Sequence, residues 1–186
     1  MKRYIFLFSI FLLFYSCRIF DKSSRKHIIT QNEVGFFVTC SGSNFLTNNK
    51  YFRANSIGES LDQEISKRKA LNNAKSDIVD SIQDLLTSVI HSYINSSTFN
   101  NVKQALVRLE GLNREVIKEE LVGIKTICEK LTKTTEGKFK AYIAIELSAQ
   151  KLVDKFHERI MKDDLLTIDY DYEKFKDIFE KEMGKL

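Results

Sequence analysis

The longest regular feature of the chain is a series of apolar residues spaced three and four positions apart within residues 59–94. From Leu71 to Tyr93 the successive steps are 3, 4, 4, 3, 4 and 4, and polar or charged residues fill most of the positions between. This spacing is typical of one apolar stripe on a long amphipathic helix. Since such a stripe must be covered, we expect the helix to lie on a sheet; a coiled coil or a membrane-surface helix is the alternative.

Helical spacing recurs in three shorter segments. Residues 99–119 and 149–162 each carry an apolar face, and residues 163–170 between the last two helices read as a loop. The C-terminal segment has aromatic residues at Tyr170, Tyr172, Phe175 and Phe179. We expect this last helix to pack in the core, and the alternative is a docking arm for a partner or a second copy.

Alternation of apolar and polar residues predicts the strands. Residues 138–148 alternate cleanly and, with 121–131 and a turn at 134–137, predict a β-hairpin. Residues 35–40 and 50–58 are also strand-like, residues 41–50 read as a loop, and Gly58 and Ser60 are expected to form the turn into the long helix. The predicted fold is α+β, with an antiparallel sheet of three to four strands covered on one face by long amphipathic helices in the order β-α-(α)-β-β-α-α.

The N-terminus has the pattern of a secretory leader. Lys2 and Arg3 precede thirteen almost entirely apolar residues, 4–16, which are too few to cross a bilayer of ~30 Å hydrocarbon. Residues 13–17, Leu-Phe-Tyr-Ser-Cys, resemble the lipobox of bacterial lipoproteins, although Phe14 and Tyr15 are larger than the usual residues. The resemblance implies that Cys17 becomes the N-terminus and carries a diacylglyceryl thioether and an N-acyl chain. An ordinary signal peptide with a stray cysteine is the alternative.

These patterns divide the chain into four parts. We expect a lipoprotein signal peptide at 1–16, a lipid-anchored polar tether at 17–34, an α+β module at 35–165 and a C-terminal helical arm at 166–186. The chain of 186 residues holds 29 basic against 25 acidic residues, of mixed sign along most of its length. No positive cluster of the kind that nucleic-acid binding requires is evident, so we expect no nucleic-acid partner.

Candidate catalytic and metal-binding residues are few. His27, His91 and His157 have no metal-ligand spacing, so no metal site is expected. Asp169, Asp171 and Glu173 alternate as in a calcium loop but lack its glycine and distal glutamate, and we interpret them as an acidic turn that caps the last helix. No nucleophile elbow, phosphate loop or dinucleotide motif occurs, and we expect neither catalytic residues nor an enzyme.

Two cysteines besides Cys17 fall in strand-like segments. Cys40 and Cys128 are a candidate disulfide, because an envelope compartment is oxidising. The sequence alone does not give their geometry, and buried free thiols are the preferred interpretation.

Two segments resemble a known family. Both follow a cysteine of lipobox type, and together they resemble the twenty-kilodalton bacterial membrane-associated lipoproteins, the Lpp-twenty family. The two segments are FRANSIGESLDQEISKRKALNNAKSDIVDSI and LVGIKTICEKLTKTTEGKFKAYIAIEL. They are also similar to the N-terminal module of flagellar assembly protein T. The resemblance covers roughly residues 50–150 and implies a β-α-β-β core, an outer-membrane location and no known catalysis. The helix at 99–119 is an insertion relative to that core.

The sequence therefore favours a lipid-anchored, non-enzymatic envelope lipoprotein of the bacterial outer membrane. It would act as a structural or protein-interaction module through a protein partner or self-association, with no cofactor beyond the lipid on Cys17. The alternative is a binding module for a small molecule or glycan, with a groove between the sheet and the helix at 99–119. A pocket lined by Tyr51, Tyr93 or Tyr142 would favour that alternative.

Overall fold

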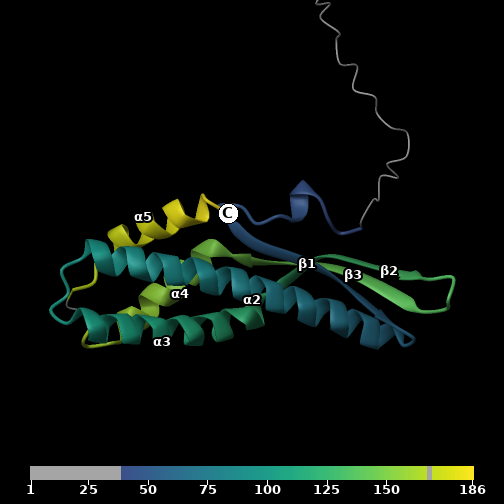
Figure 1. Ribbon diagram of the computed structural model, residues 1–186, viewed down its shortest axis with the longest axis horizontal. Coiled ribbons are helices and arrows are strands. Elements are labelled where there is room, and N and C mark those ends of the chain that lie inside the picture. Colours follow the sequence, from purple (N-terminus) through teal and green to yellow (C-terminus); the bar gives the residue numbers. More distant parts are fainter. Residues whose placement is uncertain (1–38, 167–168) are drawn as a thin grey trace, which may run out of the picture. The chain divides into compact units, whose positions relative to one another are not determined.

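The computed structural model describes residues 39–166 and 169–186, which belong to one compact unit, Val38–Leu186. Within this unit the fold is α+β, as predicted (Figure 1). The strands are β1 (Tyr51–Ser60), β2 (Lys125–Lys133) and β3 (Phe139–Ser148). The helices are α2 (Gln63–Ser96), α3 (Val102–Glu120), α4 (Ala149–Ile160) and α5 (Tyr172–Met183), with short 3-10 turns η1 (Ser43–Phe45) and η2 (Leu121–Gly123).

The three strands form an antiparallel sheet in the order β1-β3-β2. The predicted hairpin joins β2 to β3, and its turn closes where the Gly137 N–H donates to the Thr134 carbonyl at 3.0 Å. Gly137 has a φ of 83°, a left-handed conformation that favours glycine. The register of β2 shifts between Thr126 and Cys128, where an extra residue forms a bulge. The strand expected at 35–40 lies largely outside the described residues, and Thr39 and Cys40 form part of a turn.

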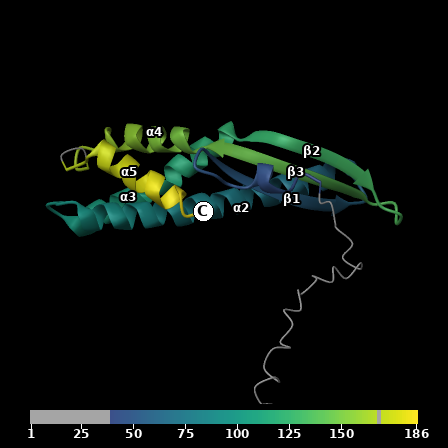
Figure 2. The same cartoon turned by 90° about the horizontal axis from the view of Figure 1, so that it is seen from above.

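One helix, α2, covers one face of the sheet (Figure 2). Alternate residues of β1 and β3, including Phe52, Ile143 and Ile145, are buried in the same core as Ala74 and Ile78 of α2. At about 1.5 Å per residue its 34 residues span about 51 Å, longer than a ten-residue strand. The second half of α2 extends beyond the sheet and packs with α3 and α5, while α4 packs on α3. The predicted packing of helices on one face of the sheet is therefore confirmed, and α2 makes most of the contact with the strands.

Gly58 lies inside β1, so the predicted turn at this position is wrong. The strand continues to Ser60, and α2 begins after Asp62, whose carboxylate accepts the Ile65 N–H at 2.8 Å. A Cβ atom at residue 58 would lie 2.1 Å from the Ser66 carbonyl oxygen. The glycine is required here because β1 and the first turns of α2 cross at very short range.

The C-terminal helix α5 belongs to the core. Phe175, Phe179 and Met183 are at most 2 % exposed, and the Phe175 ring stacks on Phe156 of α4 with centroids 5.0 Å apart. The helical arm predicted at 166–186 lies within the same compact unit as the sheet, Val38–Leu186. The core-packing interpretation of its aromatic residues is confirmed.

Candidate functional site

The predicted lipidation site, Cys17, lies outside the described residues, as do the leader at 1–16, the tether at 17–34 and His27. The compact unit Val38–Leu186 follows them in the chain. Two features of that unit combine polar and reactive groups: a disulfide on the sheet and a pocket beside the C-terminal helix.

Cys40 and Cys128 form a disulfide, with an S–S distance of 2.05 Å and Cα atoms 5.6 Å apart. The preference for two free thiols is therefore wrong. The sequence offered this pair as a candidate disulfide but could not favour it, because the pairing depends on the path of residues 39–50, which cross the sheet, and on the bulge beside Cys128. Cys40 adopts a φ of 58°, a left-handed conformation that is uncommon for a residue with a side chain.

Residues 39–50, which we call the strap, lie on the sheet face opposite α2 (Figure 1). At one end the strap is fixed to β2 by the disulfide. At the other, the Thr47 hydroxyl accepts the Arg53 N–H at 3.0 Å and donates to the Arg53 carbonyl at 3.1 Å. Beneath the strap Ala144 of β3 is completely buried, although it points away from α2. The strap therefore covers part of the second sheet face and satisfies free hydrogen-bonding groups of β1.

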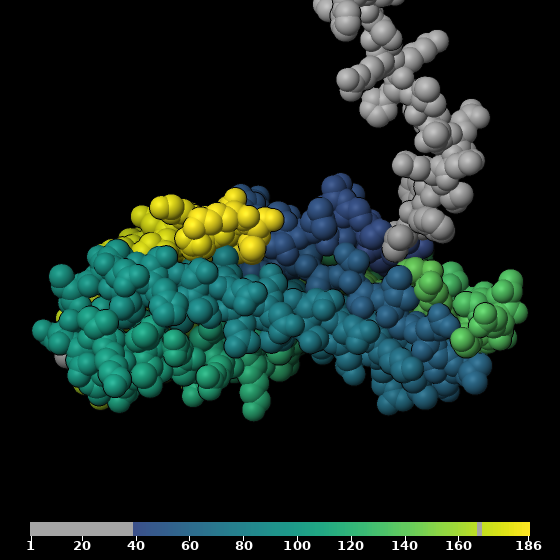
Figure 3. All heavy atoms as spheres, viewed as in Figure 1, coloured from purple at the N-terminus to yellow at the C-terminus, as the bar shows by residue number. Residues whose placement is uncertain are grey.

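A pocket of about 610 Å³ lies where the start of β1, the junction of β3 with α4, and α5 meet. Figure 3 shows the two outer walls, α5 in yellow and the dark blue strap region, on the same surface of the unit. A hydrogen bond of 3.0 Å from the Ala149 N–H to the Lys50 carbonyl joins the β3–α4 junction to the segment before β1 in the pocket wall. Its volume falls within the range of small-molecule sites, about 300–1,000 Å³.

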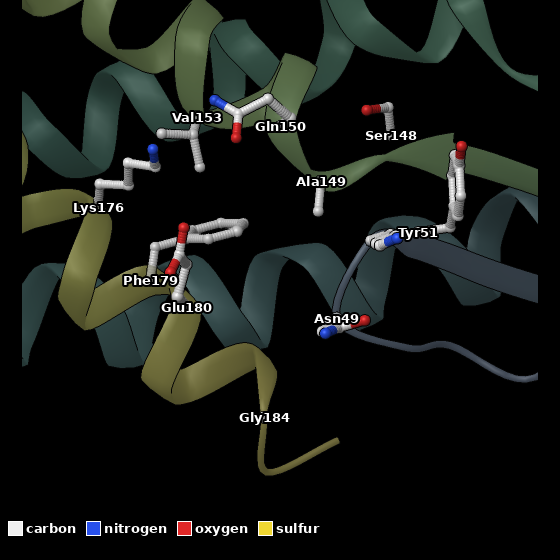
Figure 4. A pocket seen from close by; sticks show the side chains of 11 residues that line it. Asn49, Tyr51, Ser148, Ala149, Gln150, Val153, Lys176, Phe179, Glu180 and Gly184 are labelled. Carbon is white, nitrogen blue, oxygen red and sulfur yellow. The ribbon is translucent and has the colours of Figure 1, made fainter.

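The pocket has an apolar floor and a polar rim (Figure 4). The floor consists of Ala149, Val153 and Phe179, all buried. Around it stand polar and charged residues from three elements: Asn49, Lys50, Tyr51, Ser148, Gln150, Lys176 and Glu180. This arrangement suits a ligand with an apolar part and polar groups, and it holds no nucleophile–base pair.

A pocket lined by Tyr51, Tyr93 or Tyr142 would favour the alternative function, and of these three residues Tyr51 lines this pocket. Tyr93 is fully buried in an aromatic cluster, where its hydroxyl accepts the Asp171 N–H at 2.6 Å and its ring contacts Phe175 edge-on. Burial raises the pKa of the Tyr93 hydroxyl above its ordinary value. Tyr142 is half-buried on the face opposite α2. This pocket lies beside α4 and α5, whereas the alternative function was predicted to use a groove beside the helix at 99–119.

The acidic residues near the C-terminus hold helix ends and loops in place. The Asp171 carboxylate caps α5 by accepting the Lys174 N–H at 3.1 Å, as predicted. Asp169 accepts the backbone N–H of Asn100 at 3.2 Å and thereby joins the α4–α5 loop to the α2–α3 loop. Among residues 39–166 and 169–186 no group of three histidine, cysteine or acidic residues could hold a metal ion.

His91 lies exposed on α2 and His157 half-buried on α4. The ring of His157 lies 4.4 Å from that of Tyr172, between centroids. Within the described part of the chain, no helix is both long enough and apolar enough to cross a membrane.

Comparisons with known proteins were made at three levels. A scan against protein-family models, a search of curated proteins and a search of solved structures each gave no match.

Proposed function

We propose that this protein is a lipid-anchored lipoprotein of the bacterial outer membrane, whose α+β body acts without catalysis through contacts with a protein partner or with a second copy. The anchor would be a diacylglyceryl thioether on Cys17, at the end of a leader of the lipoprotein type. One stable anchor of this kind requires two or more acyl chains, each adding about 0.8 kcal/mol per buried CH₂.

The observation that carries the proposal is the Cys40–Cys128 disulfide. Disulfides persist in oxidising compartments and are rare in a reducing cytosol. A disulfide in the folded body therefore agrees with export by the leader, which is an independent feature of the sequence.

Metabolic labelling with a palmitate analogue tests the anchor. The wild-type chain is expected to take up the label and to sediment with membranes, and Cys17→Ala is expected to lose both properties. The matched control is Cys40→Ser/Cys128→Ser, which removes the other two cysteines and should keep the label. Equal labelling of wild type and Cys17→Ala would contradict the proposal.

The pocket favours a second candidate function, an envelope module that binds a small molecule or a glycan. Its floor of Val153 and Phe179 and its rim of Lys50 and Lys176 could accept a ligand of mixed polarity. A library of sugars and small metabolites, screened by thermal shift, tests this function. A genuine ligand should raise the melting temperature of the wild type and not that of Gln150→Trp, in which an indole occupies the rim.

A further inference from the structure

The rim of the pocket beside α5 carries charges of both signs. Lys50 comes just before β1, and Lys176 and Glu180 lie on α5. None of these three side chains forms an ion pair with another described residue, whereas Lys185 and Glu182 pair with each other near the C-terminus of the same helix. A ligand that enters the pocket therefore meets both cationic and anionic groups that are not already paired.

The two charged residues of α5 are four positions apart, so their side chains leave the helix one turn apart, with about 5–6 Å between Cβ atoms. The order of lysine before glutamate is the less favourable one for a pair within a helix. Figure 4 shows Lys176 and Glu180 on the α5 side of the pocket, with Asn49 and Tyr51 across from them. A molecule with an anionic and a cationic group close together matches this arrangement.

Apolar surface lies directly beside these charges. Val153 and Phe179 line the floor of the pocket, and each is 2 % exposed. Phe179 comes immediately before Glu180 in α5, so an apolar group on the floor lies next to the charged part of the rim. The volume of about 610 Å³ falls within the range of sites for drug-sized ligands, about 300–1,000 Å³, and so accommodates a short peptide.

Two side-chain amides supply further polar groups. The Gln150 amide N–H donates to the Asp154 carboxylate at 2.7 Å, which leaves the Gln150 carbonyl as an acceptor at the rim. Asn49 forms no side-chain hydrogen bond within the described part of the chain, and its amide offers both donors and an acceptor. These groups match the C=O and N–H of a peptide bond. A neutral sugar would use the amides but leave the charges of Lys176 and Glu180 uncompensated.

We propose that this pocket binds a short zwitterionic peptide with an apolar side chain. The carboxylate of the peptide pairs with Lys50 and Lys176, and its ammonium group pairs with Glu180. Its apolar side chain lies on Val153 and Phe179. The inference rests on the second candidate function, binding of a small molecule at this pocket, and is independent of the lipid anchor.

The test is isothermal titration calorimetry on the full chain, purified in a neutral detergent. The probes are dipeptides of leucine and phenylalanine in three forms: with both ends free, with the amino end acetylated, and with the carboxyl end amidated. We expect the free form to bind most tightly. Each blocked end removes one ion pair and should raise the dissociation constant by up to about 5-fold.

Two variants assign the ends of the peptide to residues. Lys176→Gln should weaken binding of the free form as amidation does, and amidation should then have little further effect. Glu180→Gln should behave in the same way toward acetylation. Such non-additivity is expected only if the altered groups of protein and ligand contact each other.

The matched controls are Lys181→Gln and Glu173→Gln, which remove the same charges from exposed positions of α5 outside the pocket. Both should bind the free dipeptides as the wild type does, and circular dichroism should show that all four variants are folded. Equal affinity for free and blocked dipeptides, equal binding by Gln150→Trp, or no binding of any dipeptide would overturn the inference. A sugar or metabolite that stabilises the wild type but not Gln150→Trp would then still support the second candidate function.

Discussion

At the scale of single residues, the contact between β1 and α2 depends on Gly58. A Cβ atom at this position would lie 2.1 Å from the Ser66 carbonyl oxygen and 2.5 Å from the Ala70 nitrogen, both backbone atoms that cannot move independently. Gly58→Ala is expected to destabilise the fold by about 3 kcal/mol, because overpacking against backbone forces the strand and helix apart. Chemical denaturation measures the loss.

Gly111 in α3 provides the opposite case, since no atom lies within 4 Å of the site of an added Cβ. Gly111→Ala is expected to stabilise the protein by up to about 1 kcal/mol, because alanine is the better helix former. If Gly58→Ala and Gly111→Ala destabilised the protein equally, the close crossing of β1 and α2 at Gly58 would not be the cause of the lost stability.

Two buried tyrosines predict sensitivity to alkaline pH. Burial raises the pKa of the hydroxyls of Tyr93 and Tyr170, which share one aromatic cluster with ring centroids 5.9 Å apart. The unfolded chain would ionise near the ordinary value of 10.0 while the folded chain keeps its protons. Their contribution to stability is therefore fully present below pH 10 and is lost as the pH rises further.

Replacement of these tyrosines tests the pH dependence. Above pH 10 the free energy of unfolding of Tyr170→Phe should fall less steeply with pH than that of the wild type. Near neutral pH the two proteins should show the same pH dependence. Tyr142→Phe, at a half-buried position on the sheet face opposite α2, serves as the matched control and should keep the wild-type slope. Parallel slopes for the wild type and Tyr170→Phe would contradict the role of its ionisation.

At the scale of elements, α5 is part of the hydrophobic core, and we expect the fold to depend on it. It contributes Phe175, Phe179 and Met183 to the core and packs on the second half of α2. Phe175→Ala is expected to cost about 3–5 kcal/mol because it leaves a cavity between Tyr93 and Phe156. Truncation after Asp164 should abolish cooperative thermal unfolding. Retention of the fold by the truncated chain would restore the docking-arm interpretation.

Most elements could be predicted from periodicity alone. Residues 138–148 alternate, and α2 carries an apolar stripe, because each element buries one face against a single neighbouring layer. Burial of one face leaves a periodic pattern of apolar residues in the sequence. The predicted α2 began four residues early because Asp62, its cap, was not recognised and β1 was ended at Gly58. The role of Gly58 follows from the short distance between β1 and α2, and no local sequence pattern gives that distance.

The candidate site was less predictable than the fold. Asp171 was recognised because a cap is a local feature of the sequence. The pocket combines residues from β1, the β3–α4 junction and α5, so that Tyr51 was anticipated but its partners Lys176 and Phe179 were not. The pairing of Cys40 with Cys128 likewise joins positions 88 residues apart through a path that only the folded structure defines.

At the scale of the whole molecule, the disulfide closes a loop that includes β1, α2 and α3. For a separation of 88 residues, loss of chain entropy in the unfolded state corresponds to about 4.6 kcal/mol, against a usual measured range of about 2–4 kcal/mol. Reduction is therefore expected to lower the midpoint of urea unfolding markedly. The measurement compares oxidised and reduced wild type with Cys40→Ser/Cys128→Ser, which should not respond to reductant. A wild type that is equally stable in both states would contradict this expectation.

The Thr47 hydroxyl forms hydrogen bonds with both the N–H and the carbonyl of Arg53, and these bonds limit how copies of the protein could join through their sheets. An open-ended fibre built by strand addition needs two available borders on every subunit. Here Thr47 blocks the free edge of β1 at Arg53, midway along the strand. Among the described residues β2 has a strand partner on one side only, so its outer edge could pair with another strand. Copies that joined through their sheets would therefore stop at a pair and could not form an open-ended polymer.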